Sequence, residues 1–73
     1  MNNLLVENII KAVNNELKNG LLCITIICDF HHYITHKPIN IYSDEAKIGI
    51  YDNDTYCIML NNKAIDSIEI VQF

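Results

Sequence analysis

The sequence contains no arginine and no tryptophan, and its formal net charge of −4 includes five basic residues, all of them lysines. Arginine is the side chain best suited to paired contacts with phosphates and base edges. An acidic chain without arginine lacks the usual means of neutralising a nucleic-acid backbone. We therefore expect nucleic acid to be a disfavoured partner, with a local site inside an oligomeric pore as the open exception.

Glycine and proline are also scarce, with two and one residues, whereas 51% of the residues are hydrophobic and only 19% are charged. This composition is not that of a disordered or low-complexity chain. The 73 residues suffice for one domain, 1–73, which buries only about 60% of the surface that its unfolded chain exposes. Some apolar side chains must therefore lie on the surface, where clusters of them usually mark an interface. We expect a homo-oligomer, a partner-bound state, or both.

Signals for export and for membrane insertion are missing as well. No basic stretch precedes the first apolar residues, and the longest apolar run, residues 21–27, is far too short to span a bilayer. The odd number of cysteines, Cys23, Cys28 and Cys57, is most simply explained by reduced thiols in a cytoplasmic protein. We expect a cytoplasmic protein that does not contact membranes.

Residues 3–18 have the periodicity of an amphipathic helix. Asn2 or Asn3 can cap its N-terminus, and Gly20 can take the left-handed conformation that ends a helix. The predicted apolar face consists of Leu5, Val6, Ile9, Ile10, Ala12, Val13 and Leu17, and the opposite face of Glu7, Lys11, Asn14 and Lys18.

The strongest predicted strand is residues 21–30. One face carries Leu22, Ile24, Ile26, Cys28 and Phe30, and the other carries Leu21, Cys23, Thr25, Ile27 and Asp29. Because both faces are largely apolar, we expect a central strand that is covered on both sides, with the face that includes Cys28 and Phe30 towards the core.

The remaining strands are shorter. A strand within 33–42 is weakened by Pro38, which has no N–H to donate. Strands are expected at 47–51, 55–60 and 64–71, separated by turns at 43–45 and 52–54 and by a tight hairpin at Asn61-Asn62. The last strand breaks strict alternation, which indicates a bulge or one 3₁₀ turn at Asp66-Ser67. The predicted fold class is α+β: an N-terminal amphipathic helix followed by a four- or five-stranded antiparallel sheet, either open or closed as a small SH3-like or Sm-like barrel.

Residues 58–68 combine an apolar strand, a tight turn and two apolar residues three apart, Ile65 and Ile68. This outline resembles the second sequence motif of the Sm-like family, which includes the bacterial Hfq proteins. The resemblance implies an N-terminal helix, five strands closing a strongly bent barrel, and assembly into a ring. It does not carry RNA binding across, because Asn61-Asn62-Lys63 stands where the family has a basic RNA-binding turn.

One cluster of polar residues has metal-binding chemistry: His31, His32 and His36 with Asp29. Its spacing is not the helical i,i+4 pairing of metalloprotease motifs, so we interpret it as a polar loop without a metal. A thiol nucleophile at Cys28 activated by one of these histidines is also disfavoured, since Cys28 is expected in the core. We therefore predict no catalytic residues, no cofactor, no metal and no enzymatic activity.

The apolar and tyrosine side chains that the helix does not cover are the predicted interface, because such side chains are enriched where proteins associate. They are Leu21, Cys23, Ile27, Tyr42, Tyr51, Tyr56, Cys57, Met59 and Phe73. The leading hypothesis is a small non-enzymatic binding protein that associates with itself and with another protein. By analogy it is an inhibitor or regulator carried by a phage or mobile element, of the anti-defence type. The alternative is an Sm-like oligomeric ring that binds RNA or a small nucleotide ligand.

Overall fold

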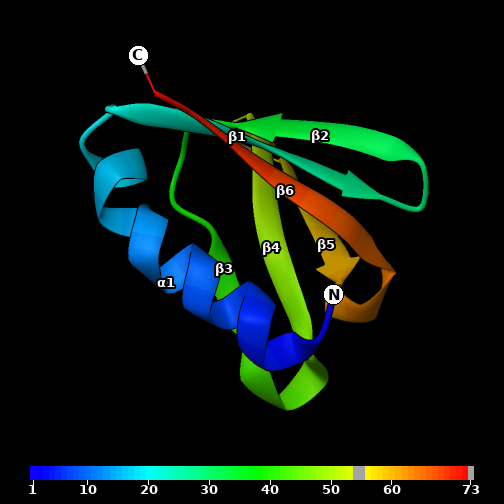
Figure 1. Ribbon diagram of the computed structural model, residues 1–73. Helices are drawn as coiled ribbons and strands as arrows, with labels where there is room; N and C mark the ends of the chain where they lie inside the picture. The colour runs from blue at the N-terminus through cyan, green and yellow to red at the C-terminus, as the bar shows by residue number, and fades with distance from the viewer. Residues whose placement is uncertain (54–55, 73) are drawn as a thin grey trace.

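One α-helix is followed by two antiparallel sheets of three strands each (Figure 1), which confirms the α+β prediction. The computed structural model describes residues 1–53 and 56–72, except for the side chains of residues 52, 53 and 56. The elements are α1 (Asn3–Lys18), β1 (Leu22–Cys28), β2 (His31–Thr35), β3 (Asn40–Tyr42), the 3₁₀ helix η1 (Ser43–Glu45), β4 (Lys47–Asn53), β5 (Tyr56–Asn61), the 3₁₀ helix η2 (Asn62–Ala64) and β6 (Ile65–Gln72).

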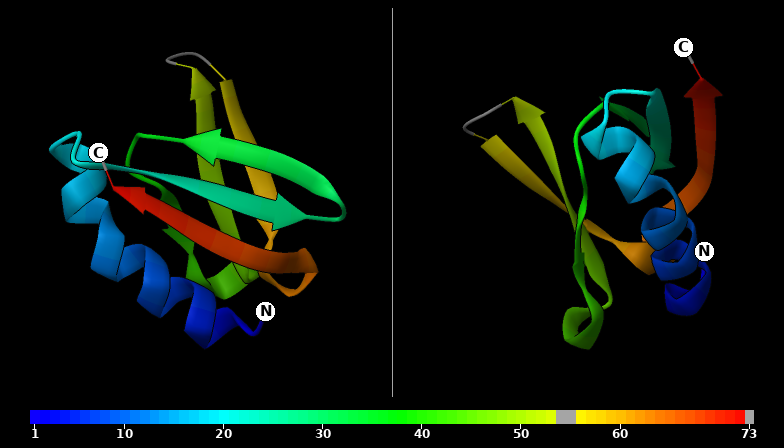
Figure 2. Two further views of the ribbon diagram at one scale, coloured as in Figure 1. Left: turned by 45° about the horizontal axis from the view of Figure 1, so that its top comes forward. Right: turned by 90° about the vertical axis from the view of Figure 1, so that its left-hand side faces the viewer.

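The strands are ordered β2-β1-β6 in one sheet and β3-β4-β5 in the other. As predicted, β1 is a central strand. Figure 2 shows the two sheets on opposite sides of the domain, with α1 alongside them. Their inner faces and α1 share one hydrophobic core, so each sheet has an outer face that points away from it. Within the described residues, no strand pairing closes the two sheets into a barrel.

Pro38 explains where the chain leaves the first sheet. The weak strand expected within 33–42 is two short strands, β2 and β3, which lie on either side of Pro38 and belong to different sheets. A proline cannot donate a ladder hydrogen bond, so continuous pairing is interrupted at this position.

The predicted hairpin at Asn61-Asn62 is wrong. β5 and β6 do not pair, because η2 redirects the chain and β6 returns to pair with β1. The side chain of Asn61 accepts a hydrogen bond from the backbone N–H of Lys63 at 3.0 Å and stabilises this turn. The predicted irregularity at Asp66 is confirmed, since Cys28 pairs with Ile65 and Ile27 with Ser67, which leaves Asp66 as the extra residue of a bulge.

The ends of α1 follow from local capping. The side chain of Asn2 accepts a hydrogen bond from the backbone N–H of Leu5 at 2.8 Å. At the other end Gly20 has a φ of 73°, and the N–H of Leu21 reaches the carbonyl of Glu16 at 2.9 Å. This is the Schellman arrangement expected for a glycine at C′, so both predicted helix ends are confirmed.

The predicted rotation of α1 is wrong by part of a turn. Glu7 is buried and accepts a hydrogen bond from the hydroxyl of Ser43, although it was expected on the polar face. Asn14, also expected to be solvated, bonds the backbone of Ile39 in both directions. Leu5 and Ala12, expected in the core, are exposed. These polar contacts with η1 and with the segment before β3 turn the helix towards the β3-β4-β5 sheet.

The hydrophobic core contains residues from α1 and from both sheets. Its buried hydrophobic members are Val6, Ile10, Val13, Leu17, Leu22, Ile24, Ile26, Cys28, Ile39, Ile48, Ile50, Leu60 and Ile65. No helix in the described part of the chain has both the length and the apolar character needed to span a membrane.

Candidate functional site

The outer face of the β2-β1-β6 sheet is the first candidate surface, and we call it the β1 face. Cys23 and Ile27, both predicted interface residues, lie on it because alternate residues of β1 point away from the core. Leu21, also a predicted interface residue, directly precedes β1 at the end of this face and is exposed. Strand pairing sets Ile34 of β2 and Glu69 of β6 on either side of Thr25. The β1 face consists of Leu21, Cys23, Thr25, Ile27, His32, Ile34, Ser67, Glu69 and Val71.

Apolar side chains on the β1 face are open to solvent. Leu21 is 58% exposed, Ile34 is 63% exposed and Val71 is 51% exposed. Cys23 and Ile27 are half-buried between them. β1 is therefore covered by the core on one side only, although both sides were expected to be covered. Ile34 and Val71 were not among the predicted interface residues, and the alternation of residues 32–34 beside a central strand was the available signal for Ile34.

The outer face of the β3-β4-β5 sheet is the second candidate surface, and we call it the Gly49 face. Three predicted interface side chains converge over Gly49. A Cβ atom at this glycine would lie 3.0 Å from Cys57 Sγ, 3.1 Å from Tyr42 Cε2 and 3.4 Å from Met59 Sδ. Gly49 is buried beneath them, and Tyr51 lies opposite Cys57 in the ladder. The Gly49 face consists of Tyr42, Gly49, Tyr51, Cys57 and Met59, together with the polar Asn40, Lys47 and Asn61.

The predicted interface residues thus form two groups on two outer faces. The two remaining members, the side chain of Tyr56 and the residue Phe73, lie outside the described part of the chain.

Phe30 lies at the turn between β1 and β2, and the prediction that it faces the core is wrong. Its side chain is 94% exposed. β1 ends at Cys28 and β2 begins at His31, so only Asp29 and Phe30 form the loop. Both have left-handed backbone conformations, with φ of 49° and 66°, as a type I′ turn requires. The strand expected to continue to Phe30 stops because the chain reverses there.

The histidines next to this turn do not converge. His31 Nδ1 lies 3.0 Å from the backbone oxygen of Asp29, whereas His32 is on the β1 face and His36 follows the end of β2. No group of three or more His, Cys, Asp or Glu side chains in the described residues is arranged to hold a metal ion. The absence of a metal from this protein stays a prediction for elemental analysis.

Cys28 lies on the core side of β1. Burial raises the pKa of its thiol above the usual value, and the nearby carboxylates of Asp29 and Asp66 act in the same direction. An activated nucleophile needs the opposite shift, because the thiolate is the reactive form. The surroundings of Cys28 are those of a structural thiol.

We predict that alkylation by iodoacetamide at pH 8 distinguishes the three thiols of the native protein. In dilute protein, in which the subunits are separate, Cys23 and Cys57 are half-buried on outer faces and should react first. Cys28 should react only on unfolding, because it is buried and less ionised. Peptide mass spectrometry over time measures the order. Equal rates for Cys28 and Cys23 in the folded protein would contradict the placement of Cys28.

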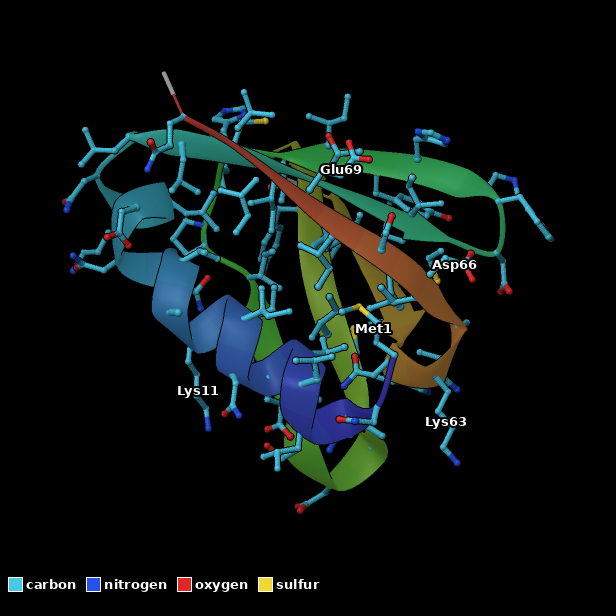
Figure 3. All side chains as sticks on the ribbon, in the orientation of Figure 1. Met1, Lys11, Lys63, Asp66 and Glu69 are labelled. Atoms are coloured by element: carbon cyan, nitrogen blue, oxygen red, sulfur yellow. The ribbon has the colours of Figure 1, made fainter. Side chains whose placement is uncertain are left out.

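Other polar contacts join the two ends of the fold. The N-terminal ammonium of Met1 donates to the backbone oxygen of Ile65 at 2.6 Å, and the side-chain amide of the buried Asn62 donates to Asn3. Figure 3 shows Met1 beside the turn that carries Lys63. These contacts fasten α1 to η2 and leave the outer faces untouched.

A shallow hollow of about 320 Å³ lies at η1, at the end of β3. It is lined by Ile41, Tyr42, Ser43, Asp44 and Glu45, and the hydroxyl of Ser43 is already bonded to Glu7 behind it. The residues that line the hollow are therefore both apolar and acidic.

Comparison of this chain with protein-family models, with curated proteins and with solved structures finds no match.

Proposed function

We propose that this is a non-enzymatic protein that acts through protein–protein association, with the β1 face as its contact surface. The observation that carries the proposal is the exposure of Leu21, Ile34 and Val71 on a sheet face whose opposite side is the core. Contiguous exposed apolar groups on a small domain usually mark an interaction site.

A second copy of the chain is the partner that we propose for this face. Most small oligomers are assemblies of identical chains with closed symmetry. Within the described residues β6 pairs only with β1, so its other edge offers backbone groups for a further strand. Such an edge lies next to the exposed Val71 and enlarges the contact surface.

The chemistry of the side chains supports a binding role over catalysis. Cys28 has a raised pKa, and its neighbouring histidines point to separate surroundings. The hollow at η1 contains carboxylates and a serine already bonded to Glu7, without a described histidine or lysine in its lining. General acid–base chemistry needs paired groups within hydrogen-bond reach of one substrate.

An inhibitor or regulator from a phage or mobile element remains our proposal for the biological role. It rests on the small acidic chain and on two outer faces, since one face can join copies while the Gly49 face contacts another protein. The three free cysteines support a reducing compartment, and we propose the cytoplasm.

The element order favours one second candidate, an Sm-like ring that binds RNA or a nucleotide. If β2 and β3 are counted as one strand interrupted at Pro38, five strands follow the helix, as the family resemblance implies. A native mass of five or more copies, together with salt-dependent binding of a labelled oligonucleotide, would favour this candidate over the first.

We predict that Ile34→Lys lowers the oligomer mass while leaving the subunit folded. Ile34 is 63% exposed, so a lysine there stays solvated in the free subunit and is buried only in the assembly. Ile27→Lys should act in the same direction, with some loss of stability because Ile27 is half-buried. Sedimentation equilibrium over a wide concentration range should show at least a tenfold higher dissociation constant for Ile34→Lys.

Leu4→Lys is the matched control, since Leu4 is 69% exposed on α1 and the change in side chain is comparable. Its mass distribution should equal that of the wild type. If the wild type associates and Ile34→Lys associates equally well, the β1 face is not the contact surface.

A further inference from the structure

β6 is the longest described strand, and one of its edges is open. It spans Ile65–Gln72, and within the described residues it pairs only with β1. Exposed edges of folded proteins are usually short or carry lysine, proline or a bulge, because an open edge attracts further strands. Beyond the bulge at Asp66, residues 67–72 contain neither lysine nor proline. This part of β6 therefore lacks the usual protection against pairing with another chain.

The side chains at this edge are open on the inner side of the sheet as well. Ile70 pairs with the fully buried Ile24 and so faces the same way, yet it is 48% exposed. Figure 2 shows α1 between β3 and β6, and in its right-hand view the C-terminal half of β6 extends clear of the helix. The exposed Leu5 and the half-buried Ile9 lie on the flank of α1 that faces away from Glu7 and its contact with η1. A strand added to β6 would cover Ile70 and lie beside this flank.

The sequence of β6 is complementary to itself in one antiparallel register. When a strand pairs with a copy of itself about a two-fold axis, one residue lies opposite its own equivalent, and this residue fixes all the other pairs. With Ile70 at the axis, Glu69 lies opposite Val71 of the other copy, and Ile68 lies opposite Gln72. Residues 68–72 then pair without the bulge, and no carboxylate lies opposite another.

The neighbouring registers are less favourable. An axis at Glu69 places two carboxylates opposite each other, which is destabilising. An axis at Ile68 places Ile70 opposite Asp66 of the other copy, which is the extra residue of the bulge. An axis at Val71 leaves only residues 70–72 to pair among those that the structure describes. The strand therefore favours an axis at Ile70.

We propose that β6 pairs with β6 of a second copy about a two-fold axis at Ile70. The two three-stranded sheets then form one sheet in the order β2-β1-β6-β6-β1-β2, and the β1 faces of both copies become one continuous surface. The inference rests on the proposed self-association through the β1 face and adds a second contact to it. Because so short an edge contact is marginal alone, it holds only while the doubled β1 face packs on that of another such pair. The expected assembly has four copies in closed symmetry.

Oxidative cross-linking tests the position of the axis. In a background with Cys23→Ala and Cys57→Ala, mild oxidation of Ile70→Cys should give a covalent dimer. Residues at the axis have Cα atoms about 4.5–5.5 Å apart, which is within the range of a disulfide.

Gln72→Cys is the matched control, because Gln72 lies on the same side of the same strand and is exposed. In the proposed register the two copies of residue 72 are four positions apart along the strand, which is about 13 Å. Electrophoresis without reductant measures both yields. A dimer yield from Ile70→Cys no greater than that from Gln72→Cys would overturn the proposal.

Ile70→Lys separates the edge contact from the β1 face. Ile70 is on the inner side of the sheet, so this substitution leaves the β1 face unchanged, and its exposure lets the subunit fold. Sedimentation equilibrium should show two copies for Ile70→Lys and four for Ile70→Val, with circular dichroism spectra like that of the wild type. An Ile70→Lys protein that still assembles as four copies would contradict the edge contact.

The two proposals fail in different ways. If Ile34→Lys dissociates the protein while Ile70→Cys gives no more covalent dimer than its control, the β1 face stands and the edge contact is refuted. If the wild type is a monomer at high concentration, both are refuted.

Discussion

Val13→Asp is expected to abolish the cooperative thermal transition of the domain. Val13 is 7% exposed and belongs to the core that α1 shares with both sheets. An unpaired carboxylate at this position costs about 4 kcal/mol or more, which is most of the stability of a domain of this size. Far-ultraviolet circular dichroism during heating measures the loss directly.

Ala12→Asp is the matched control, because it places the same side chain one residue away on the same helix. The sequence pattern puts Ala12 on the buried face, whereas the structure exposes it. We therefore expect Ala12→Asp to change the free energy of unfolding by less than about 1 kcal/mol. Equal destabilisation by both substitutions would mean that α1 has the rotation predicted from its periodicity.

Asn14→Ala is expected to lower the free energy of unfolding by about 2–4 kcal/mol, because two backbone groups of a buried residue lose their partner. The Asn14 amide donates to the carbonyl of Ile39 at 3.0 Å, and the N–H of Ile39 donates to Asn14 Oδ1 at 2.9 Å. Ile39 is only 3% exposed, so water does not replace these bonds. Urea denaturation at constant protein concentration measures the change.

Asn15→Ala provides the comparison, since Asn15 is the neighbouring residue and is exposed. Alanine favours helix formation, so this variant should be as stable as the wild type or slightly more stable. A similar loss in both variants would show that the Asn14 contacts with Ile39 do not hold α1 in place.

Local signals in the sequence were sufficient for the ends of α1, for the central position of β1 and for the bulge at Asp66. Each depends on residues close in the chain: Asn2 as a cap, Gly20 at a left-handed position, and the change of spacing between Ile65 and Ile68. The interruption between β2 and β3 at Pro38 is also a local effect, since the proline lacks the N–H that strand pairing needs.

Tertiary contacts decided what the pattern did not predict. Glu7 and Asn14 look like solvated helix residues, but their partners are Ser43 in η1 and Ile39 just before β3, so no periodicity in α1 reveals these contacts. The pairing of β6 with β1 depends on η2 and joins segments far apart in the sequence. Phe30 continued an apolar alternation and was assigned to the core, because a turn without glycine or asparagine gives no warning.

The two candidate surfaces were also predicted in part from local signals, and the rest of them depends on tertiary contacts. Alternation along β1 correctly placed Cys23 and Ile27 on the same face, because the period of a strand fixes which side chains share a face. Grouping Tyr42, Cys57 and Met59 over Gly49 required the ladders of β3, β4 and β5. Ile34 and Val71 join the β1 face only through pairing with β1 and were missed.

The most direct measurement of the central claim is the solution mass of the wild-type chain by light scattering across a wide concentration range. The subunit has a mass of 8.4 kDa. If the chain associates through the β1 face, its mass should rise with concentration to a defined multiple of this value. The Ile34→Lys substitution should then lower the mass towards 8.4 kDa. A wild-type chain that remains at 8.4 kDa at the highest concentration would contradict the account.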